Sequence, residues 1–310
     1  MSLPSRIIFM GTPDFALPSL DAMLALGVRP LAVFTQPDKP AGRGRSVAPP
    51  PVKRRALEHG LEIRQPATLK DPEVIAELRA LRPEAIAVAA YGKILPPAVL
   101  EIPSLGCINV HASLLPRHRG ASPIAHAIWA GDAKVGISIM KMEAGLDTGP
   151  VYLSRGIPAP QDVTTGSLTP VLARLGADLL VATLKGLKAG ILEPEPQDDS
   201  LATLAPRLKV EQGRLDFTRS ADELERQVRA FDPWPGTYFE VSGERIKVHS
   251  VTLGPMASLP PGEVLAFPGL CVACGDGRTL VLGIIQRAGK RPLSASEVLH
   301  GFKIPPGSKI

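Results

Sequence analysis

The stretch RIIFM-GTP, residues 6–13, decides the fold class. Arg6–Met10 is a short apolar run that stops at a Gly-Thr-Pro turn, which is typical of a buried strand. Residues 18–26 then show helical spacing and stop at Gly27, a common helix terminator. A second apolar run, LAVFT at residues 31–35, follows that glycine. A strand, a helix and a second strand in this order predict two parallel strands joined by a helical crossover.

The same alternation continues downstream. Residues 52–58 form a helix-like stretch, and Asp71-Pro72 opens another helix, with Asp as the N-cap and Pro at the first helical position. Further runs typical of strands lie at 85–90, 107–110, 135–141 and 151–157, and a long helical pattern runs from 168 to 189 and stops at Gly190. Alternating strands and helices predict a Rossmann-like α/β domain, with a mostly parallel sheet covered on both faces.

The character of the sequence changes after Gly190. Residues 193–200 (EPEPQDDS) are polar and contain two prolines, which favours an interdomain linker. Beyond them, a helix at 221–230 is followed by short strand-like runs at 237–241, 246–253, 262–266, 270–274 and 279–286. Short strands at this spacing predict a small barrel or sandwich. We therefore expect a catalytic domain at 1–190, a linker at 191–207 and a small β domain at 208–310.

Composition narrows the class of protein. The 310 residues carry a formal net charge of +5, which fits a polyanionic partner but equally an ordinary, slightly basic surface. Three cysteines are too few for a disulfide framework. The first residues lack the pattern of a signal peptide, and no run of about 18 apolar residues predicts a membrane span. We expect a cytoplasmic protein without a membrane contact.

The residues that carry chemistry cluster between 106 and 149. Asn109 and His111 end a predicted strand, and their alternation points both side chains the same way. In an open parallel sheet, ligands bind beyond the carboxyl ends of strands. An amide can hydrogen-bond a developing oxyanion and an imidazole can move or stabilise a proton, which suits acyl transfer. Asp147, in the loop GLDTG, can orient and charge-balance His111.

Five motifs lie in order along nearly the whole chain: GTPDF at 11–15, QPDKPAGRG at 36–44, CINVHASLLP at 107–116, GLDTG at 145–149 and FDPWP at 231–235. On these motifs the chain resembles the methionyl-tRNA formyltransferase family. The Asn-x-His and Ser-Leu-Leu-Pro pair is shared by folate-dependent formyltransferases, whereas GTPDF and QPDKPAGRG are more specific to the tRNA enzymes. At His118 the chain departs from an aromatic residue that is usual in the family.

The resemblance implies 10-formyltetrahydrofolate as formyl donor and the amino group of methionyl initiator tRNA as acceptor. It implies that Asn109, His111 and Asp147 are catalytic. Asn109 is assigned to the oxyanion, while His111 is left with either proton transfer or oxyanion stabilisation. It also implies that the segment Ser113, Leu114, Leu115 and Pro116 lines the folate pocket, and that the C-terminal domain is an oligonucleotide-binding (OB-like) barrel that supports the tRNA.

Two basic segments are candidates for tRNA contact. Residues 39–55 carry six Lys or Arg and no acidic residue, and glycines flank Arg43. A flexible basic loop at the carboxyl end of the second strand suits phosphate binding, and the resemblance implies that it contacts the acceptor arm through Lys39, Arg43 and Arg45. In the C-terminal domain, Arg287, Lys290 and Arg291 are the candidates.

Other classes of function remain open from the sequence alone. A formyltransferase for a small amine would share the catalytic trio, as would a hydrolase that removes formyl from folate, and a tRNA-binding protein could keep the fold without the reaction. Gly11-Thr12-Pro13 is neither a dinucleotide nor a Walker-type loop, so we expect no nucleotide cofactor. Cys271 and Cys274 lack a second pair, so we expect no metal. No motif points to an obligate protein partner.

Overall fold

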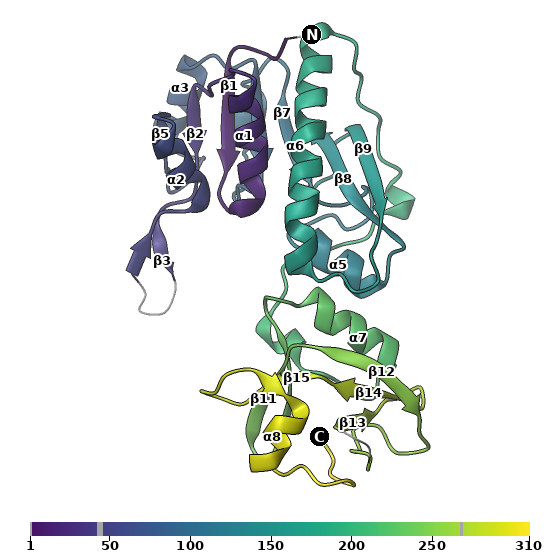
Figure 1. The fold of residues 1–310 in the computed structure, drawn as a ribbon. Coiled ribbons are helices and arrows are strands. Elements are labelled where there is room, and N and C mark those ends of the chain that lie inside the picture. Colours follow the sequence, from purple (N-terminus) through teal and green to yellow (C-terminus); the bar gives the residue numbers. More distant parts are fainter. Residues whose placement is uncertain (1, 42–45, 267–268) are drawn as a thin grey trace. The chain divides into compact units, whose positions relative to one another are not determined.

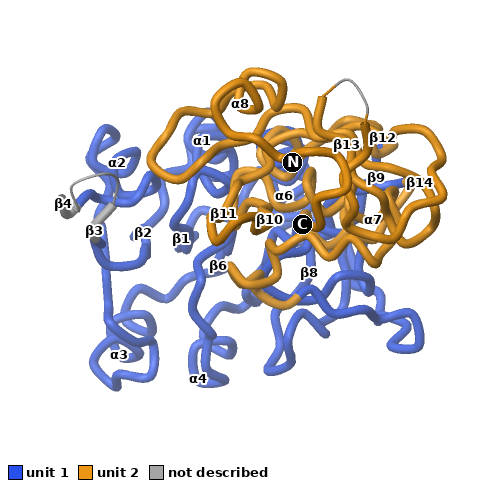
Figure 2. The backbone as a smooth tube through the Cα atoms, turned by 90° about the horizontal axis from the view of Figure 1, so that it is seen from below, with its two compact units in different colours: residues 1–123, 134–157, 169–205 blue, residues 124–133, 158–168, 206–310 orange. Residues whose placement is uncertain are grey.

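The structure is a computed structural model that describes residues 2–41, 46–266 and 269–310 (Figure 1). The chain folds into two compact units, coloured separately in Figure 2. The domain limits predicted from the sequence, at 190 and 208, remain a prediction. Unit 1 comprises Met1–Pro123, Lys134–Ile157 and Thr169–Ala205, and unit 2 comprises Ile124–Ala133, Pro158–Leu168 and Pro206–Ile310.

Unit 1 is built around a seven-stranded sheet in the order β5-β2-β1-β6-β7-β8-β9. The first five of these strands are parallel to their neighbours, and β8 is antiparallel to β7. The chain moves from β1 to one edge and then returns to fill the other side, which is the doubly wound arrangement. The strands are β1 (Ile7–Gly11), β2 (Ala32–Phe34), β5 (Ile63–Arg64), β6 (Ala85–Ala89), β7 (Cys107–His111), β8 (Lys134–Lys141) and β9 (Val151–Pro158).

Helices cover both faces of this sheet. Figures 1 and 2 show α1 and α6 on one face and α3 and α4 on the other. The strands between them are apolar because both faces are covered, and all five residues of β1 and of β6 are buried. Two short strands that pair antiparallel, β3 and β4, follow β2. The bounds are α1 (Leu17–Ala25), β3 (Lys39–Ala41), β4 (Ser46–Ala48), α2 (Pro51–Glu58), α3 (Pro72–Ala80), α4 (Pro97–Leu100) and α6 (Thr165–Ala189).

The start of α3 confirms the capping prediction. The Asp71 side chain accepts a hydrogen bond of 3.0 Å from the Glu73 amide, and Pro72 occupies the first helical position. A side-chain oxygen at the N-cap satisfies an amide that has no partner inside the helix. The position of this helix was therefore readable from two adjacent residues.

Helix α6 is the longest helix among the described residues. By length and composition alone it could cross a bilayer, although half of its most apolar window is buried within the structure. Leu172, Leu180 and Leu184 are fully buried, and at Gly176 a Cβ would lie 2.6 Å from Cγ1 of Val110. Such close packing against β7 is the pattern of a core helix, whose apolar stripe faces its own sheet.

Unit 2 holds two antiparallel sheets around one apolar core. The sheets have the orders β10-β11-β15-β16 and β12-β14-β13, and α7 and α8 pack against the same core. Cys271 and Cys274 are buried in this unit. The fold class predicted from the sequence, a mostly parallel α/β sheet followed by a small antiparallel β domain, is confirmed. The elements are α5 (Pro123–Ala130), α7 (Ala221–Ala230), β10 (Thr237–Val241), β11 (Glu244–Val248), β12 (Val251–Met256), β13 (Leu270–Ala273), β14 (Arg278–Leu282), β15 (Ile284–Gln286), β16 (Leu293–Ser294) and α8 (Ala295–Gly301).

Three predicted strands of this unit were wrong in detail. The run 246–253 is divided at His249–Ser250 between β11 and β12, and the run 279–286 is divided at Gly283 between β14 and β15. The run 262–266 contributes only isolated bridges at Glu263 and Val264. Apolar alternation continues across both breaks, so periodicity alone does not reveal that the chain changes sheet there.

Glu84, which precedes β6, gives a stability prediction. Its carboxylate accepts hydrogen bonds from the amides of Ser5 (2.8 Å) and Arg6 (3.1 Å) and pairs with Lys188. The hydrogen bond from Lys188 is the main reason that the pKa of Glu84 falls to about 2. A lowered carboxyl pKa stabilises the folded state above the unfolded value, and this stability is lost as pH falls toward 2.

We expect Glu84→Gln to lower the free energy of unfolding at pH 7 by about 1 kcal/mol, because partial exposure screens the ion pair. The difference from wild type should shrink as pH falls from 4.5 toward 2. Urea unfolding at pH 7 and pH 3 measures it, with Glu101→Gln on the exposed surface as the control. An equal loss at both pH values would contradict this account of Glu84.

Candidate active site

The candidate site lies at the carboxyl end of β7. In this strand Asn109 pairs in register with Val88 of β6 and Met140 of β8, and His111 pairs with Ser138 of β8. Asn109 is half-buried and His111 is 5% exposed. Because strand residues two apart share a face, both side chains project from the same side of the sheet. The structure therefore brings the two predicted residues to one edge.

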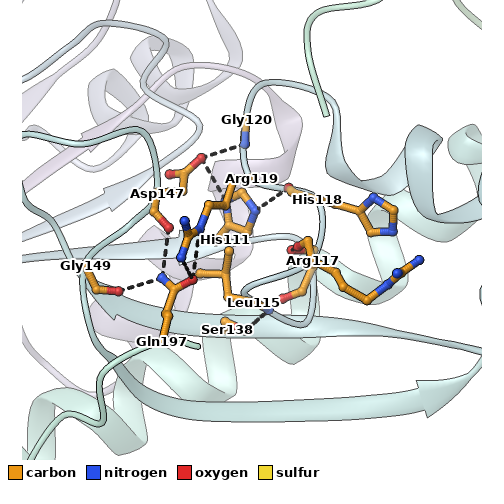
Figure 3. A network of polar contacts seen from close by, with 11 residues as sticks. His111, Leu115, Arg117, His118, Arg119, Gly120, Ser138, Asp147, Gly149 and Gln197 are labelled. Carbon is orange, nitrogen blue, oxygen red and sulfur yellow. Dashed lines mark hydrogen bonds and ion pairs between the residues drawn. The ribbon is translucent and has the colours of Figure 1, made fainter. Parts of the chain in front are cut away.

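The His111 ring is held between two protein groups (Figure 3). Its Nε2 lies 3.0 Å from the main-chain oxygen of His118, and its Nδ1 lies 3.6 Å from Oδ2 of Asp147. A carbonyl oxygen only accepts, so Nε2 is the donor and carries a hydrogen. The same Oδ2 accepts a hydrogen bond of 2.8 Å from the Gly120 amide. The neutral ring therefore points an unprotonated Nδ1 at the carboxylate.

Burial decides the charge of this ring. Desolvation lowers the pKa of His111 below its ordinary 6.5, while the charge of Asp147 acts in the opposite direction. The imidazole is consequently uncharged at neutral pH. A proton taken up at Nδ1 would turn the contact with Asp147 into an ion pair. The pair is thus built to receive one proton.

Asn109 differs from its neighbour because its amide is free. No hydrogen bond to the Asn109 side chain is found among the residues that the structure describes. A half-buried amide without a protein partner retains its full capacity to donate. It is therefore available to a ligand oxygen at the mouth of the site.

The segment after β7 is fixed by Ser138, which no motif of the sequence indicates. Oγ of Ser138, fully buried in β8, donates to the Ser113 carbonyl (2.8 Å) and accepts from the Leu115 amide (3.0 Å). Ser113 Oγ donates to the Arg117 carbonyl at 2.6 Å, and the Leu114 side chain packs toward Gly156. The predicted folate segment 113–116 is therefore held in one conformation. A serine inside the apolar run VGISIMK was the available signal.

Two further residues join the loops around the pair. The Gln197 amide and the Arg119 guanidinium, drawn in Figure 3, bridge residues 118–120 and 147–149. Gln197 lies in the segment that the sequence predicts as a linker. His118 contributes to the site through its carbonyl oxygen and adopts the left-handed conformation (φ +59°), so its main chain is what contacts His111.

The residues predicted to contact tRNA differ in how far their side chains are already engaged within the protein. Lys39 is exposed on β3, and its Nζ donates to Oε1 of Gln36 at 2.9 Å. Arg43 and Arg45 lie outside the described residues. Arg287 is engaged within unit 2, where it forms hydrogen bonds of 3.0 and 2.7 Å to Glu244 and lies 4.2 Å above the Phe302 ring.

These contacts leave Lys290 and Arg291 as the more accessible cations of the predicted C-terminal set, because both are exposed.

The two aromatic residues of the turn 231–235 differ in burial. Phe231 is fully buried and contacts the Trp129 ring edge-on at 5.0 Å, whereas Trp234 is 49% exposed. Within the described ranges, no group of three His, Cys, Asp or Glu side chains is placed to hold a metal ion.

Comparison with known proteins agrees with this architecture. The family described as "Formyl transferase" matches residues 5–184, and "Formyl transferase, C-terminal domain" matches residues 207–303. The chain is 50% identical to a methionyl-tRNA formyltransferase of Stutzerimonas stutzeri, covering 97% of this chain and 96% of the relative. It is 49% identical to that of Myxococcus xanthus, covering 100% and 98%.

Solved structures share the fold at lower identity. A methionyl-tRNA formyltransferase from Clostridium thermocellum has a TM-score of 0.55 at 17% identity and covers 80% of this chain and 92% of its own. An N-formyltransferase from Helicobacter canadensis, in complex with folinic acid and dTDP-3-aminofucose, has a TM-score of 0.66 at 15% identity and covers 92% and 100%. Close relatives over nearly the whole length, with both domains matched in order, show that the chain belongs to the methionyl-tRNA formyltransferase family.

Proposed function

We propose that this protein transfers the formyl group of 10-formyltetrahydrofolate to the α-amino group of methionyl initiator tRNA. The observation that carries the proposal is the end of β7, where the free Asn109 amide lies two residues from the buried His111–Asp147 pair. The names of relatives about 50% identical over nearly the whole chain support the choice of acceptor. The product is N-formylmethionyl-tRNA, used in translation initiation.

The reaction forms one bond and breaks another at the formyl carbon. The α-amine, with an ordinary pKa of about 7.7–8.0, is neutral in a minority of molecules at cellular pH, and this neutral form attacks. Its nitrogen bonds to the formyl carbon, the bond from that carbon to folate N10 breaks, and the proton lost by the amine is finally carried by N10. The enzyme must therefore orient two substrates, stabilise an oxyanion and guide one proton.

Asn109 and His111 divide these tasks. The unpartnered Asn109 amide donates to the oxygen that becomes negative in the tetrahedral intermediate. His111 is uncharged and its Nε2 hydrogen is bound by the His118 carbonyl, so it supplies no preformed cation to that oxygen. Of the two roles left open by the sequence, the geometry favours proton acceptance, with Asp147 stabilising the imidazolium that forms.

Folate is assigned to the segment Ser113–Pro116. Ser138 binds two of its backbone groups, the Ser113 carbonyl and the Leu115 amide, so the segment offers a fixed surface just after the end of β7. Proteins of the same fold are solved with folate derivatives, namely HypX from Aquifex aeolicus with tetrahydrofolic acid (TM-score 0.60, 18% identity, covering 96% of this chain and 47% of that one) and the Helicobacter canadensis enzyme with folinic acid. The donor itself supplies the activated one-carbon group, and we propose no metal and no nucleotide cofactor.

The tRNA is assigned to the loop after β2 and to the surface of unit 2. Lys39, Arg43 and Arg45 would contact acceptor-arm phosphates, and Lys290 with Arg291 would contact phosphates elsewhere. We retain Arg287 as a weaker candidate, because its guanidinium is already paired with Glu244. We further propose that the enzyme works in the cytoplasm without a membrane contact or an obligate protein partner.

Arg43→Ala should lower kcat/KM for charged tRNA by about 10-fold or more, since a hydrogen bond to a charged group contributes about 1.5–3 kcal/mol. The slope of log Kd against log salt concentration for tRNA binding should also fall by about one, the change expected for the loss of one phosphate contact. Steady-state kinetics at two salt concentrations measure both. Arg79→Ala, an exposed arginine in the last turn of α3 and outside both basic segments, is the matched control. A strong defect in folate binding would contradict the assignment.

The defining experiment is transfer of radiolabelled formyl from 10-formyltetrahydrofolate to methionyl initiator tRNA, run beside uncharged tRNA. Label on the charged tRNA alone establishes the reaction and the acceptor amine. Folate binding without transfer to tRNA would overturn the proposed acceptor and favour a small-amine formyltransferase. Release of formate without any acceptor would favour the hydrolase, and tRNA binding with neither reaction would favour a binding protein.

A further inference from the structure

Residues 195–205, called here the return segment, come back across the loops of the candidate site. At one end, Glu195 and Val151 exchange main-chain hydrogen bonds of 2.8 Å. At the other, the Arg119 amide donates to the Thr203 carbonyl (2.9 Å), and the Ala205 amide donates to the Arg119 carbonyl (2.7 Å). The segment expected to be a linker is therefore anchored to unit 1 at both ends.

Gln197 lies between these anchors and uses every polar atom of its side chain. Its Nε2 donates to the carbonyls of Asp147 (2.8 Å) and Gly149 (2.7 Å). Its Oε1 accepts from Nε (3.1 Å) and Nη2 (2.8 Å) of Arg119. Since carbonyls only accept and a guanidinium only donates, this orientation of the amide is the only one that satisfies all four bonds.

Arg119 is the partner that makes this contact matter. Its side chain is only 7% exposed, and its guanidinium also binds Oδ1 of Asp199 at 2.6 Å. The residues on either side of it supply the His118 carbonyl and the Gly120 amide, which contact His111 and Asp147 respectively. A buried cation that the proposed reaction does not use thus lies beside both backbone atoms that hold the catalytic pair.

The Asp147 loop needs such support. Asp147 has φ +52°, in the left-handed region, which aspartate enters more readily than most residues other than glycine but still at a cost. Such conformations persist only where surrounding contacts determine them. The Gln197 bond to the carbonyl of Asp147 itself, with the second bond to Gly149, supplies two of these contacts.

We propose that Gln197, together with Arg119, is a positioning residue that sets the His111–Asp147 separation by joining the 118–120 and 147–149 loops. The expected effect on catalysis rests on the proposed function. The expected effect on the His111–Asp147 separation does not. An amide is required because one end must donate to two carbonyls and the other must accept from a guanidinium. Neither an apolar side chain nor a carboxylate of the same length can do both.

The test compares Gln197→Met and Gln197→Glu with wild type. Both variants lose the two donations to the Asp147 loop, and only the glutamate keeps a bond to Arg119. We expect kcat to fall by about 10–100-fold in both, since a displacement of about 1 Å in an active site costs up to that much. KM for folate and for tRNA should change little, because neither loop displacement removes a substrate contact.

A second readout separates positioning from loss of structure. His111 is faced by the Asp147 carboxylate, which raises its pKa, and by His118, whose charge lowers it. If Asp147 withdraws, the pKa of His111 falls, and NMR titration of the ring in the folded, substrate-free protein detects this. Gln227→Met is the matched control. Its buried amide likewise donates to two carbonyls, those of Gln212 (2.7 Å) and Arg214 (3.4 Å), but within unit 2.

The expected result is a lowered kcat and a lowered His111 pKa in both Gln197 variants, with neither change in Gln227→Met. Wild-type kcat and an unmoved His111 pKa in Gln197→Met would overturn the proposal. A kcat loss in the Gln197 variants that only follows their loss of melting temperature, with a comparable kcat loss in Gln227→Met, would overturn it as well. Should wild type prove inactive on charged tRNA, the proposed function fails, yet a lowered pKa would still establish the positioning role.

Discussion

Replacing His111 with alanine is expected to lower kcat for formyl transfer by about 10²–10⁴-fold, the range by which a positioned general acid or base contributes. The affinity for tRNA and for folate should barely change, because the buried ring contacts the His118 carbonyl and Asp147 and offers little surface to a ligand. Rapid-mixing single-turnover kinetics measure the chemical step, and equilibrium binding of each substrate measures affinity.

The mutation also removes a buried side chain, so folding has to be checked alongside activity. Far-UV circular dichroism and the melting temperature serve this purpose, and His59→Ala, an exposed histidine at the end of α2, controls for loss of an imidazole. The pH profile gives a further check. The kcat of wild type should fall as pH drops toward the lowered pKa of His111, since the protonated ring can no longer accept a proton from the amine. Turnover near the wild-type value in His111→Ala would remove this residue from the mechanism.

Replacing Asn109 with alanine is expected to lower kcat by about 10²–10³-fold, which is the typical cost of removing one donor to an oxyanion. The free energy of unfolding should be nearly unchanged, because among the described residues the amide has no hydrogen bond to lose. At Asn109 the substitution is therefore expected to lower kcat without lowering the free energy of unfolding, whereas at His111 both are expected to fall. Single-turnover rates and urea unfolding measure the two quantities.

The chain offers an unusual direct control for this second prediction. Asn109 is its only asparagine, so ¹⁵N-asparagine labelling gives one side-chain amide signal. That signal should shift when a formyl-folate analogue binds, and it should be absent in Asn109→Ala. Binding of the analogue without any shift would contradict the placement of this amide at the formyl oxygen.

Much of the fold and of the candidate site could be predicted from local features of the sequence. The Asp71-Pro72 pair predicted the start of α3, and Asn109-x-His111 after an apolar run predicted two side chains on one sheet edge. Both signals act over a few residues, where backbone sterics and hydrogen bonding suffice. The start of α8 is marked by a local signal of the same kind, the capping box formed by Ser294 and Glu297.

What the sequence did not predict depends on contacts between distant positions. Ser138 lies 25 residues from Ser113, and Gln197 lies 50 residues from Asp147. Arg287 looked like a free cation because its partner Glu244 is 43 residues away. No periodicity or motif encodes such pairs. Their geometry exists only after the strands have taken their order in the sheet, so the support of a site is harder to predict than the reacting residues.

The return segment also determines where this protein can be recombined with a relative. A catalytic half that ended at Gly190 would lack Gln197 and the Thr203 bridge, and would leave the Arg119 guanidinium buried without its amide partner. A chimera that exchanges C-terminal domains keeps these bonds native only if the crossover falls after Ala205. The part of the chain that has to stay with the candidate active site therefore extends beyond the polar, proline-containing stretch 193–200, where the sequence alone would place the crossover.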